Sequence, residues 1–321
     1  MRALVTGGVG FAGSHLCEHL AARGFEVFAL AKPGDVPPHL PASALKVFTA
    51  DVRDPGRLRH VFAEVRPDRV YHLAAFATPS EGFQDPAAIH EINVGGTGHV
   101  CEAMVATVPE ARLLFVSSGD VYGDVVPEAL PLSEENAAAP SNPYAESKAD
   151  AETVVSQFRR IHHLHAVVAR PFNHTGPRQS PGFLCPGVAR QVALAMAGGP
   201  RVVRVGNLDV ARDFNDVRDI VAGYELLLDR GAPGEVYNLA SGKATPVRWI
   251  VERLCSFASI PLTVETDPAL VRPTRSMAVA GDAAKARKLG WQPRYKLENT
   301  LSELLSFWMA QPAATAHSAR R

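Results

Sequence analysis

Short apolar runs alternate with stretches of helical periodicity through the first half of the chain. The apolar runs have the length of buried strands, and we expect strands at 3–5, 26–30, 45–49, 69–73, 113–116 and 166–169. Apolar residues at helical spacing fill the intervals and predict helices at 11–23, 58–65 and 87–106. Because the strands are apolar on both faces and alternate with helices, the pattern predicts a parallel sheet covered by helices on both sides.

The pattern changes after Pro171, where residues 171–187 are rich in proline and glycine. Beyond this loop we expect strands at 202–205 and 235–239, and helices at 219–228, 246–257 and 297–308. The sequence therefore predicts an α/β fold, with a Rossmann-type doubly wound parallel sheet and a smaller mixed α/β domain on the C-terminal side. The expected limits are 1–170 for the Rossmann domain, with 212–240 returning to it, 171–211 and 241–312 for the second domain, and 313–321 for a disordered tail.

Composition excludes several classes of function. The 321 residues include 33 Lys+Arg and 33 Asp+Glu, so the chain lacks the basic excess that binds nucleic acid. No apolar run is long enough to span a membrane. The first residues run straight into a strand and not into a secretory signal. The four cysteines are far apart and form no C-x-x-C pair, which predicts reduced thiols in the cytoplasm and no metal site.

Glycines cluster between the first strand and the first helix. Gly7, Gly10 and Gly13 fit a G-x-x-G-x-x-G spacing, and Gly8 with the last two also fits G-x-G-x-x-G. Glycine at these positions permits a tight turn, a close approach of the backbone to a pyrophosphate and close packing of helix on strand. The free N–H groups at the helix N-terminus attract phosphates. The motif predicts dinucleotide binding, with an ordinary tight turn as the alternative.

The residues after the second strand bear on the identity of the cofactor. An acidic residue there would bind the ribose 2′-hydroxyl of NAD. This chain instead has Lys32, and its first carboxylate is Asp35. Because Lys32 could pair with a 2′-phosphate, the sequence favours NADP(H), with NAD(H) as the alternative. An ordinary solvated surface lysine is the other interpretation.

Tyr144 and Lys148 form a Y-x-x-x-K motif just after Pro143, which suits the first turn of a helix. Residues four apart share a helix face, so we expect the ammonium to lower the pKa of the phenol. Tyr144 could then exchange a proton near neutral pH. Ser118 follows the fifth strand, at the sheet edge where ligands bind in parallel α/β folds, and could bind a substrate oxygen. Taken singly, these features are also typical of an ordinary helix pair and a turn serine.

Together these motifs resemble the extended short-chain dehydrogenases/reductases, a family whose members act on nucleotide sugars. The resemblance covers almost the whole chain and implies an NADP(H)-binding N-terminal domain. In such a domain Asp51 and Val52 would line the adenine, and Lys148 would also hold the nicotinamide ribose. The cofactor contacts implied are Gly7, Gly10, Phe11, Gly13, Lys32, Asp51, Val52, Leu73, Ala74, Ala75, Asn93, Tyr144, Lys148 and Phe172.

The C-terminal half resembles the members of this family that act on GDP sugars. The matching segments are 170–177, 205–208, 212–219, 237–242, 272–274 and 289–293. The implied substrate contacts are Ser118, Asn173, Arg178, Arg212 and Arg272. The three arginines would be planar forks suited to a diphosphate, although each could instead form a surface salt bridge. Related dehydratases carry a glutamate where this chain has Arg275, which has no acceptor atom, so the nucleobase stays open.

Two reactions fit this resemblance. Reduction of the C4 ketone of a GDP-4-dehydro-6-deoxy-hexose needs a hydride, a proton donor and a group that polarises the carbonyl, for which Tyr144, Ser118 and Lys148 suffice. The product would be GDP-D-rhamnose or its C4 epimer. Dehydration of GDP-mannose also needs a base near the sugar C5. Related dehydratases use a glutamate where this chain has Asp120, one methylene shorter, so the sequence favours the reductase.

Three alternatives remain open beside the reductase: a GDP-mannose 4,6-dehydratase, a nucleotide-sugar 4-epimerase with tightly bound NAD, and a non-enzymatic NADP(H)-sensing protein. The resemblance also implies a homodimer that pairs the helix at 87–106 with the tyrosine helix. The apolar residues that could supply this contact, or equally pack on their own sheet, are Ile89, Ile92, Val100, Met104 and Val154.

Overall fold

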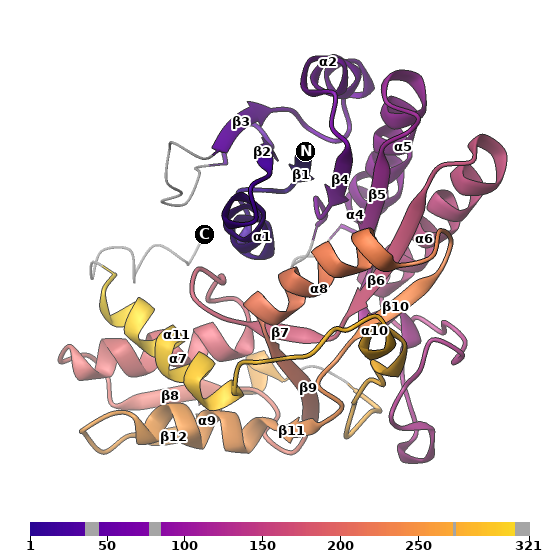
Figure 1. The fold of residues 1–321 in the computed structure, drawn as a ribbon. Coiled ribbons are helices and arrows are strands. Elements are labelled where there is room, and N and C mark those ends of the chain that lie inside the picture. The colour runs from indigo at the N-terminus through magenta and orange to yellow at the C-terminus, as the bar shows by residue number, and fades with distance from the viewer. Residues whose placement is uncertain (36–44, 77–84, 272–273, 312–321) are drawn as a thin grey trace.

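A computed structural model describes residues 1–35, 45–76, 85–271 and 274–311, and its largest element is a seven-stranded sheet (Figure 1). The strands are Arg2–Thr6 (β1), Glu26–Ala31 (β2), Leu45–Thr49 (β3), Arg69–His72 (β4), Arg112–Val116 (β5), Ala166–Pro171 (β6) and Val236–Leu239 (β10). They lie in the order β10-β6-β5-β4-β1-β2-β3, and every neighbouring pair is parallel. The carboxyl ends of all seven strands therefore share one edge, where an open α/β sheet binds its ligands.

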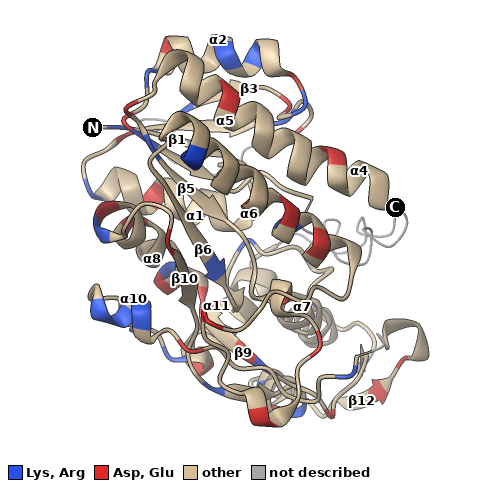
Figure 2. Ribbon diagram, turned by 90° about the vertical axis from the view of Figure 1, so that its right-hand side faces the viewer, with Lys and Arg blue, Asp and Glu red and all other residues tan. Residues whose placement is uncertain are grey.

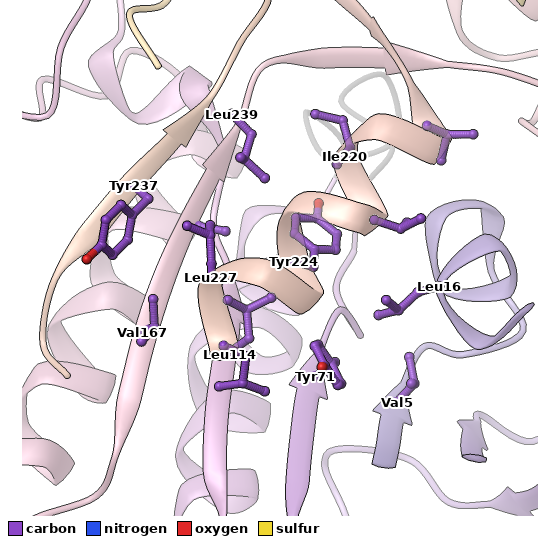
Figure 3. Close-up of a cluster of buried hydrophobic side chains, with 14 of the residues drawn as sticks. Val5, Leu16, Tyr71, Leu114, Val167, Ile220, Tyr224, Leu227, Tyr237 and Leu239 are labelled. Atoms are coloured by element: carbon purple, nitrogen blue, oxygen red, sulfur yellow. The ribbon is translucent and has the colours of Figure 1, made fainter. Parts of the chain in front are cut away.

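Helices cover both faces of this sheet. Phe11–Ala22 (α1) and Val217–Arg230 (α8) pack on one face, and Pro55–Val65 (α2), Gly96–Thr107 (α5) and Pro143–His162 (α6) pack on the other. Successive strand residues point to opposite faces, so Val5 lies in the first core and Leu4 in the second. Figure 3 shows α8 packed across the strands, with Tyr71 and Leu114 below Tyr224. Burial on both faces explains why these strands are apolar throughout.

The remaining strands form two small sheets, which lie below the main sheet in Figure 1. The first contains Asn173–Thr175 (β7), Ala211–Asp216 (β9) and Ala244–Pro246 (β11), and the second contains Val202–Val205 (β8) and Thr263–Thr266 (β12). Helices Leu184–Met196 (α7), Val247–Ser256 (α9) and Leu297–Met309 (α11) share a third apolar core. A short helix, Ala284–Lys288 (α10), lies against β10.

The α/β class and the parallel sheet expected from the sequence are confirmed. Helix α8 and strand β10 return to the main sheet, whereas β9 pairs with β7 and β11 in the smaller sheet. The domain limits stay a prediction, and the expected tail at 313–321 falls outside the described residues. The helix expected at 87–106 is three consecutive pieces: Pro86–His90 (α4), a π-helical segment Glu91–Gly95, and α5.

Charged residues of both signs are interspersed over the helices and loops (Figure 2), as the equal numbers of acidic and basic residues lead one to expect. Within the ranges that the structure describes, no helix combines the length and the apolar character needed to cross a bilayer. The four cysteines are free thiols, three of them buried.

Candidate active site

The glycine turn forms a tight junction between β1, α1 and the segment after β4. A Cβ atom on Gly13 would lie 2.1 Å from the carbonyl oxygen of Gly7, and one on Gly7 would lie 2.9 Å from the amide of Ala74. Gly7 also has a φ of +67°, which favours glycine. Helix α1 begins after Gly10 without a side-chain cap and without an acidic residue in its first turn. This helix N-terminus is therefore open to an anion.

Two cations lie at the carboxyl ends of β2 and β3. Lys32 is exposed, and its charge acts on the carboxylate of Asp51. Arg53 donates to Asp51 through its backbone N–H at 2.9 Å and through its guanidinium at 3.0 and 2.7 Å. The Arg53 hydrogen bonds hold the pKa of Asp51 below its usual range. Val52 is buried against Gly96 at the start of α5. Sequence reasoning missed Arg53, although its place directly after Asp51 and Val52 was a usable signal.

Asn93 lies in the π-helical segment between α4 and α5. Its Oδ1 accepts from the amide of Phe76 at 2.7 Å, and its Nδ2 donates to Oγ of Ser147 at 2.9 Å. Ser147 directly precedes Lys148 on α6. π-helical turns are frequent at functional sites because they redirect a side chain out of the helical repeat. Here the π-helical turn places the side-chain amide of Asn93 so that it bonds both to the segment after β4 and to helix α6. Of the other expected cofactor contacts, Phe11, Leu73 and Ala75 are half-buried.

Ser118 and Tyr144 come together at the carboxyl edge of the sheet. Ser118 follows β5 and caps a 3₁₀ turn, with its Oγ accepting from the amide of Asp120 at 3.1 Å. Helix α6 begins at Pro143 and is capped by Asn142, whose Oδ1 accepts from the amide of Ala145. The Ser118 hydroxyl lies close enough to the Tyr144 phenol to lower its pKa.

The pKa of Tyr144 is raised and not lowered, so the expectation from the Y-x-x-x-K spacing is wrong on this point. Burial is the largest cause, and the negative charge of Asp120 adds to it, while the nearby Ser118 hydroxyl works in the opposite direction. The charge of Lys148 is not among the causes of this shift. Its Nζ donates to the carbonyl oxygen of Val116 at 2.7 Å. Tyr144 therefore holds its proton near neutral pH.

Lys148 is itself perturbed. It is 3% exposed, and its Nζ lies 5.0 Å from the centre of the Phe115 ring. Burial lowers its pKa to about 8, against the opposing charge of Glu152. Across the sheet, His72 on β4 lies between two threonine hydroxyls at 2.7 and 3.1 Å, and burial together with the Lys148 charge lowers the His72 pKa to about 3. Lys148 is thus mostly charged at neutral pH, beside a neutral histidine.

Arg212 on β9 reaches the same region from the smaller sheet. Its guanidinium donates to the carbonyl oxygen of Ala211 at 2.8 Å and to Oγ1 of Thr274 at 3.3 Å. Burial lowers the pKa of Arg212, and the charge of Asp120 opposes this effect. Because Asp120 acts on both Arg212 and Tyr144, the structure brings one predicted substrate contact close to the catalytic group.

The other predicted substrate contacts fall in different places. Arg178 donates from both terminal nitrogens to the two carboxylate oxygens of Glu18, each at 2.7 Å. The structure thus gives Arg178 a partner on α1 where an open diphosphate contact was expected. Asn173 is exposed at the start of β7, and Arg272 lies outside the described residues. The side chain of Phe172, an expected cofactor contact, is 4% exposed and belongs to the core.

A polar network that sequence reasoning missed lies behind the catalytic residues. Glu152 on α6 binds Ser117 and Arg170, and Arg170 lies over the ring of Tyr122 at 4.9 Å. The Tyr122 hydroxyl donates to Oδ1 of Asn238 on β10 at 2.8 Å. Glu152 follows Lys148 by one helical turn, and this spacing was the available signal.

An uncapped, glycine-lined helix N-terminus that shares a sheet edge with a serine, a tyrosine and a lysine is the architecture of the extended short-chain dehydrogenases/reductases. The chain belongs to the family described as GDP-mannose 4,6 dehydratase, whose family model matches residues 4–304. The predicted family, fold class and oxidoreductase class are therefore confirmed.

Three comparisons define the relationship further. The chain is 37% identical over 310 residues to GDP-6-deoxy-D-mannose reductase of Pseudomonas aeruginosa, covering 96% of this chain and 97% of that protein. The structure of RMD from Pseudomonas aeruginosa complexed with NADPH is 36% identical, with a TM-score of 0.84 and coverage of 96% and 99%. UDP-glucose 4-epimerase of Thermus thermophilus, complexed with NAD, is 29% identical, with a TM-score of 0.87 and coverage of 97% and 99%.

Proposed function

We propose that this protein reduces the C4 ketone of a GDP-4-dehydro-6-deoxy-hexose with NADPH, giving GDP-D-rhamnose or its C4 epimer. The observation that carries the proposal is the placement of Ser118, Tyr144 and Lys148 together at the carboxyl edge of the sheet, with Lys148 bonded to the end of the strand that leads to Ser118. Tyr144 keeps its proton near neutral pH. A protonated phenol is what a carbonyl reduction needs. Similarity to a GDP-6-deoxy-D-mannose reductase along nearly the whole chain supports the choice of substrate.

The residues fit a phosphorylated dinucleotide. The crowded glycine turn leaves room only for backbone, and the open N-terminus of α1 would hold the pyrophosphate. Lys32 and Arg53 would pair with a 2′-phosphate, and Asp51 and Val52 would contact the adenosine. These two cations support NADP(H) over NAD(H), as does the similarity to an NADPH-bound structure. When bound, the reduced nicotinamide supplies the hydride.

The chain's own residues supply the proton and the electrostatics. Tyr144 donates its phenolic proton to the alkoxide that forms at C4, and Ser118 donates a hydrogen bond to the same oxygen. Lys148, with a pKa of about 8, stays mostly charged at neutral pH and stabilises the phenolate that Tyr144 becomes. Arg212 would pair with the diphosphate of the substrate.

A second candidate is the 4,6-dehydration that gives the family its description. The observation in its favour is the exposed carboxylate of Asp120, whose charge reaches Tyr144. A dehydratase needs such a carboxylate to take a proton from C5. Asp120 is one methylene shorter than the glutamate of the related dehydratases, and this difference favours the reductase.

The test mixes the purified protein with NADPH and GDP-4-dehydro-6-deoxy-D-mannose and follows NADPH oxidation. We expect rapid oxidation that falls by about 10²–10⁴ in kcat in Tyr144→Phe. The same substitution at the exposed Tyr295 is the matched control and should leave the rate unchanged.

A parallel arm with NADH and Lys32→Ala tests the cofactor. No oxidation by a protein that binds NADPH would refute the reductase, and a keto sugar formed from GDP-mannose alone would assign the dehydratase.

We also propose that two copies of the chain pair through α5 and α6. Ile89, Val100 and Met104 are at most 1% exposed and pack within their own subunit, so they are not available for this contact. Ile92 and Val154 are only half-buried and remain as candidate contacts. Light scattering on Val154→Arg tests the pairing, because a charge in an apolar contact should convert a dimer to monomer.

A further inference from the structure

Glu152 makes three hydrogen bonds beneath the catalytic edge of the sheet. Its Oε1 accepts from Oγ of Ser117 at 2.5 Å and from Nε of Arg170 at 2.9 Å, and its Oε2 accepts from Nη2 of Arg170 at 2.7 Å. Ser117 is 2% exposed and Arg170 is 7% exposed. A carboxylate held by a bidentate arginine and a hydroxyl in such surroundings has a fixed orientation.

These bonds tie α6 to the end of β5 at two consecutive residues. Lys148 donates to the carbonyl oxygen of Val116, and one helical turn later Glu152 accepts from Ser117. Ser118 is the next residue along the chain. The helix that carries Tyr144 and Lys148 is therefore held in register with the strand that presents Ser118. Arg170 closes the connection from β6.

The same carboxylate dominates the charges around Lys148. The titratable groups nearby are Glu152 and Tyr144 on α6, neutral His72 on β4, Asp120 after β5, and Arg170 on β6. Glu152 is the group whose charge raises the Lys148 pKa against the effect of burial. Without that charge the effect of burial would be unopposed, and Lys148 would lose its proton at lower pH.

We propose that Glu152 is a positioning residue of the reaction, which sets α6 against β5 through Ser117 and Arg170 and places a fixed negative charge one helical turn from Lys148. The proposal rests on the reductase activity proposed above and adds a residue that acts through Lys148 and Ser118 without touching the substrate. It predicts that the charge and the hydrogen bond of Glu152 have separable effects on the reaction.

The test compares the pH dependence of kcat in three variants. Wild-type activity should fall as the pH rises through about 8, where Lys148 loses its proton. In Glu152→Gln this fall should move to lower pH by about one unit, with little change in the KM for the sugar. Ser117→Ala removes one hydrogen bond to Glu152 and keeps the Glu152 charge, so it should lower kcat without changing the pH at which activity falls. Asp150→Asn removes a carboxylate that is 60% exposed on the same helix and is the matched control, which should match wild type.

If Glu152→Gln lowers kcat equally at every pH, the charge of Glu152 does not act on Lys148 and this role is refuted. It is also refuted if Asp150→Asn shifts the pH dependence of kcat as far as Glu152→Gln does. If Glu152→Gln does not fold, Glu152→Asp should fold with the wild-type pH dependence and a lower kcat; a shifted dependence contradicts the proposal. If the wild type binds NADPH but reduces no sugar, the reductase fails separately. In that case the pH dependence of the NADPH dissociation constant tests Glu152. The affinity for NADPH should fall as the pH rises and Lys148 loses its proton, and in Glu152→Gln this fall should occur at lower pH.

Discussion

Replacing Lys148 by methionine removes a buried charge while keeping an unbranched side chain of similar length. Lys148 is 3% exposed, and burial lowers its pKa from 10.5 to about 8. At roughly 1.4 kcal/mol per pKa unit, keeping the ammonium inside costs about 3 kcal/mol at neutral pH. The lost hydrogen bond to the Val116 carbonyl offsets about 1 kcal/mol of that gain. We therefore expect Lys148→Met to abolish activity and to stabilise the protein by about 2 kcal/mol at neutral pH.

The pH dependence of this difference is the sharper measurement. The pKa of Lys148 is lower in the folded chain than in the unfolded one, so between about 8 and 10.5 the unfolded state binds more protons. The free energy of unfolding of wild type should therefore rise relative to that of Lys148→Met as the pH rises through this window. Above the window, Lys148→Met should be the less stable protein. Other lysines and tyrosines titrate in both proteins and cancel in the comparison.

Urea unfolding followed by circular dichroism, without added NADPH, gives both free energies at a pH below and a pH above this window. Lys288→Met, at an exposed lysine of α10, is the control, and its difference from wild type should not depend on pH. A Lys148→Met protein that is less stable than wild type at neutral pH would refute the reasoning, as would a difference that stays constant as the pH rises.

Three further predictions follow from contacts in the fold. Gly13→Ala places a Cβ atom 2.1 Å from the Gly7 carbonyl oxygen, and we expect NADPH affinity by fluorescence titration to fall at least tenfold, whereas Gly56→Ala on α2 should have no effect. The buried carboxylate of Asp213 accepts from three backbone amides at 2.8, 2.9 and 3.2 Å, so Asp213→Asn should lower the free energy of unfolding by about 3 kcal/mol; an unchanged urea midpoint would contradict this. The Tyr224 hydroxyl is buried without a hydrogen-bond partner among the described residues, so Tyr224→Phe should be neutral or stabilising by about 1 kcal/mol in the same assay.

Local patterns were enough to predict much of the fold. Apolar runs identify strands such as β6, which spans Ala166–Pro171 where a strand at 166–169 was expected. The Y-x-x-x-K spacing puts Tyr144 and Lys148 on one face of α6, because helical geometry alone decides which residues are neighbours at that distance.

Contacts between distant segments were beyond the same reasoning. Arg178 was expected at a diphosphate, yet its partner Glu18 lies 160 residues away in the sequence. The pKa of Tyr144 depends on burial and on Asp120, and a spacing rule contains neither. The π-helical segment around Asn93 adds a residue to a turn without any change in apolar periodicity that would reveal it.

The return of α8 and β10 to the main sheet has a consequence for how the protein is made. A nascent chain that has emerged from the ribosome only as far as β6 has six of the seven strands, but α8 does not yet cover Tyr71 and Leu114. The strand β6 then also ends the sheet with an open edge, which later pairs with β10. Because the first core also includes Ala283, Ala286 and Trp291, translation must continue past residue 291 before this core can close. A gene truncated between the two halves should therefore yield an aggregating fragment.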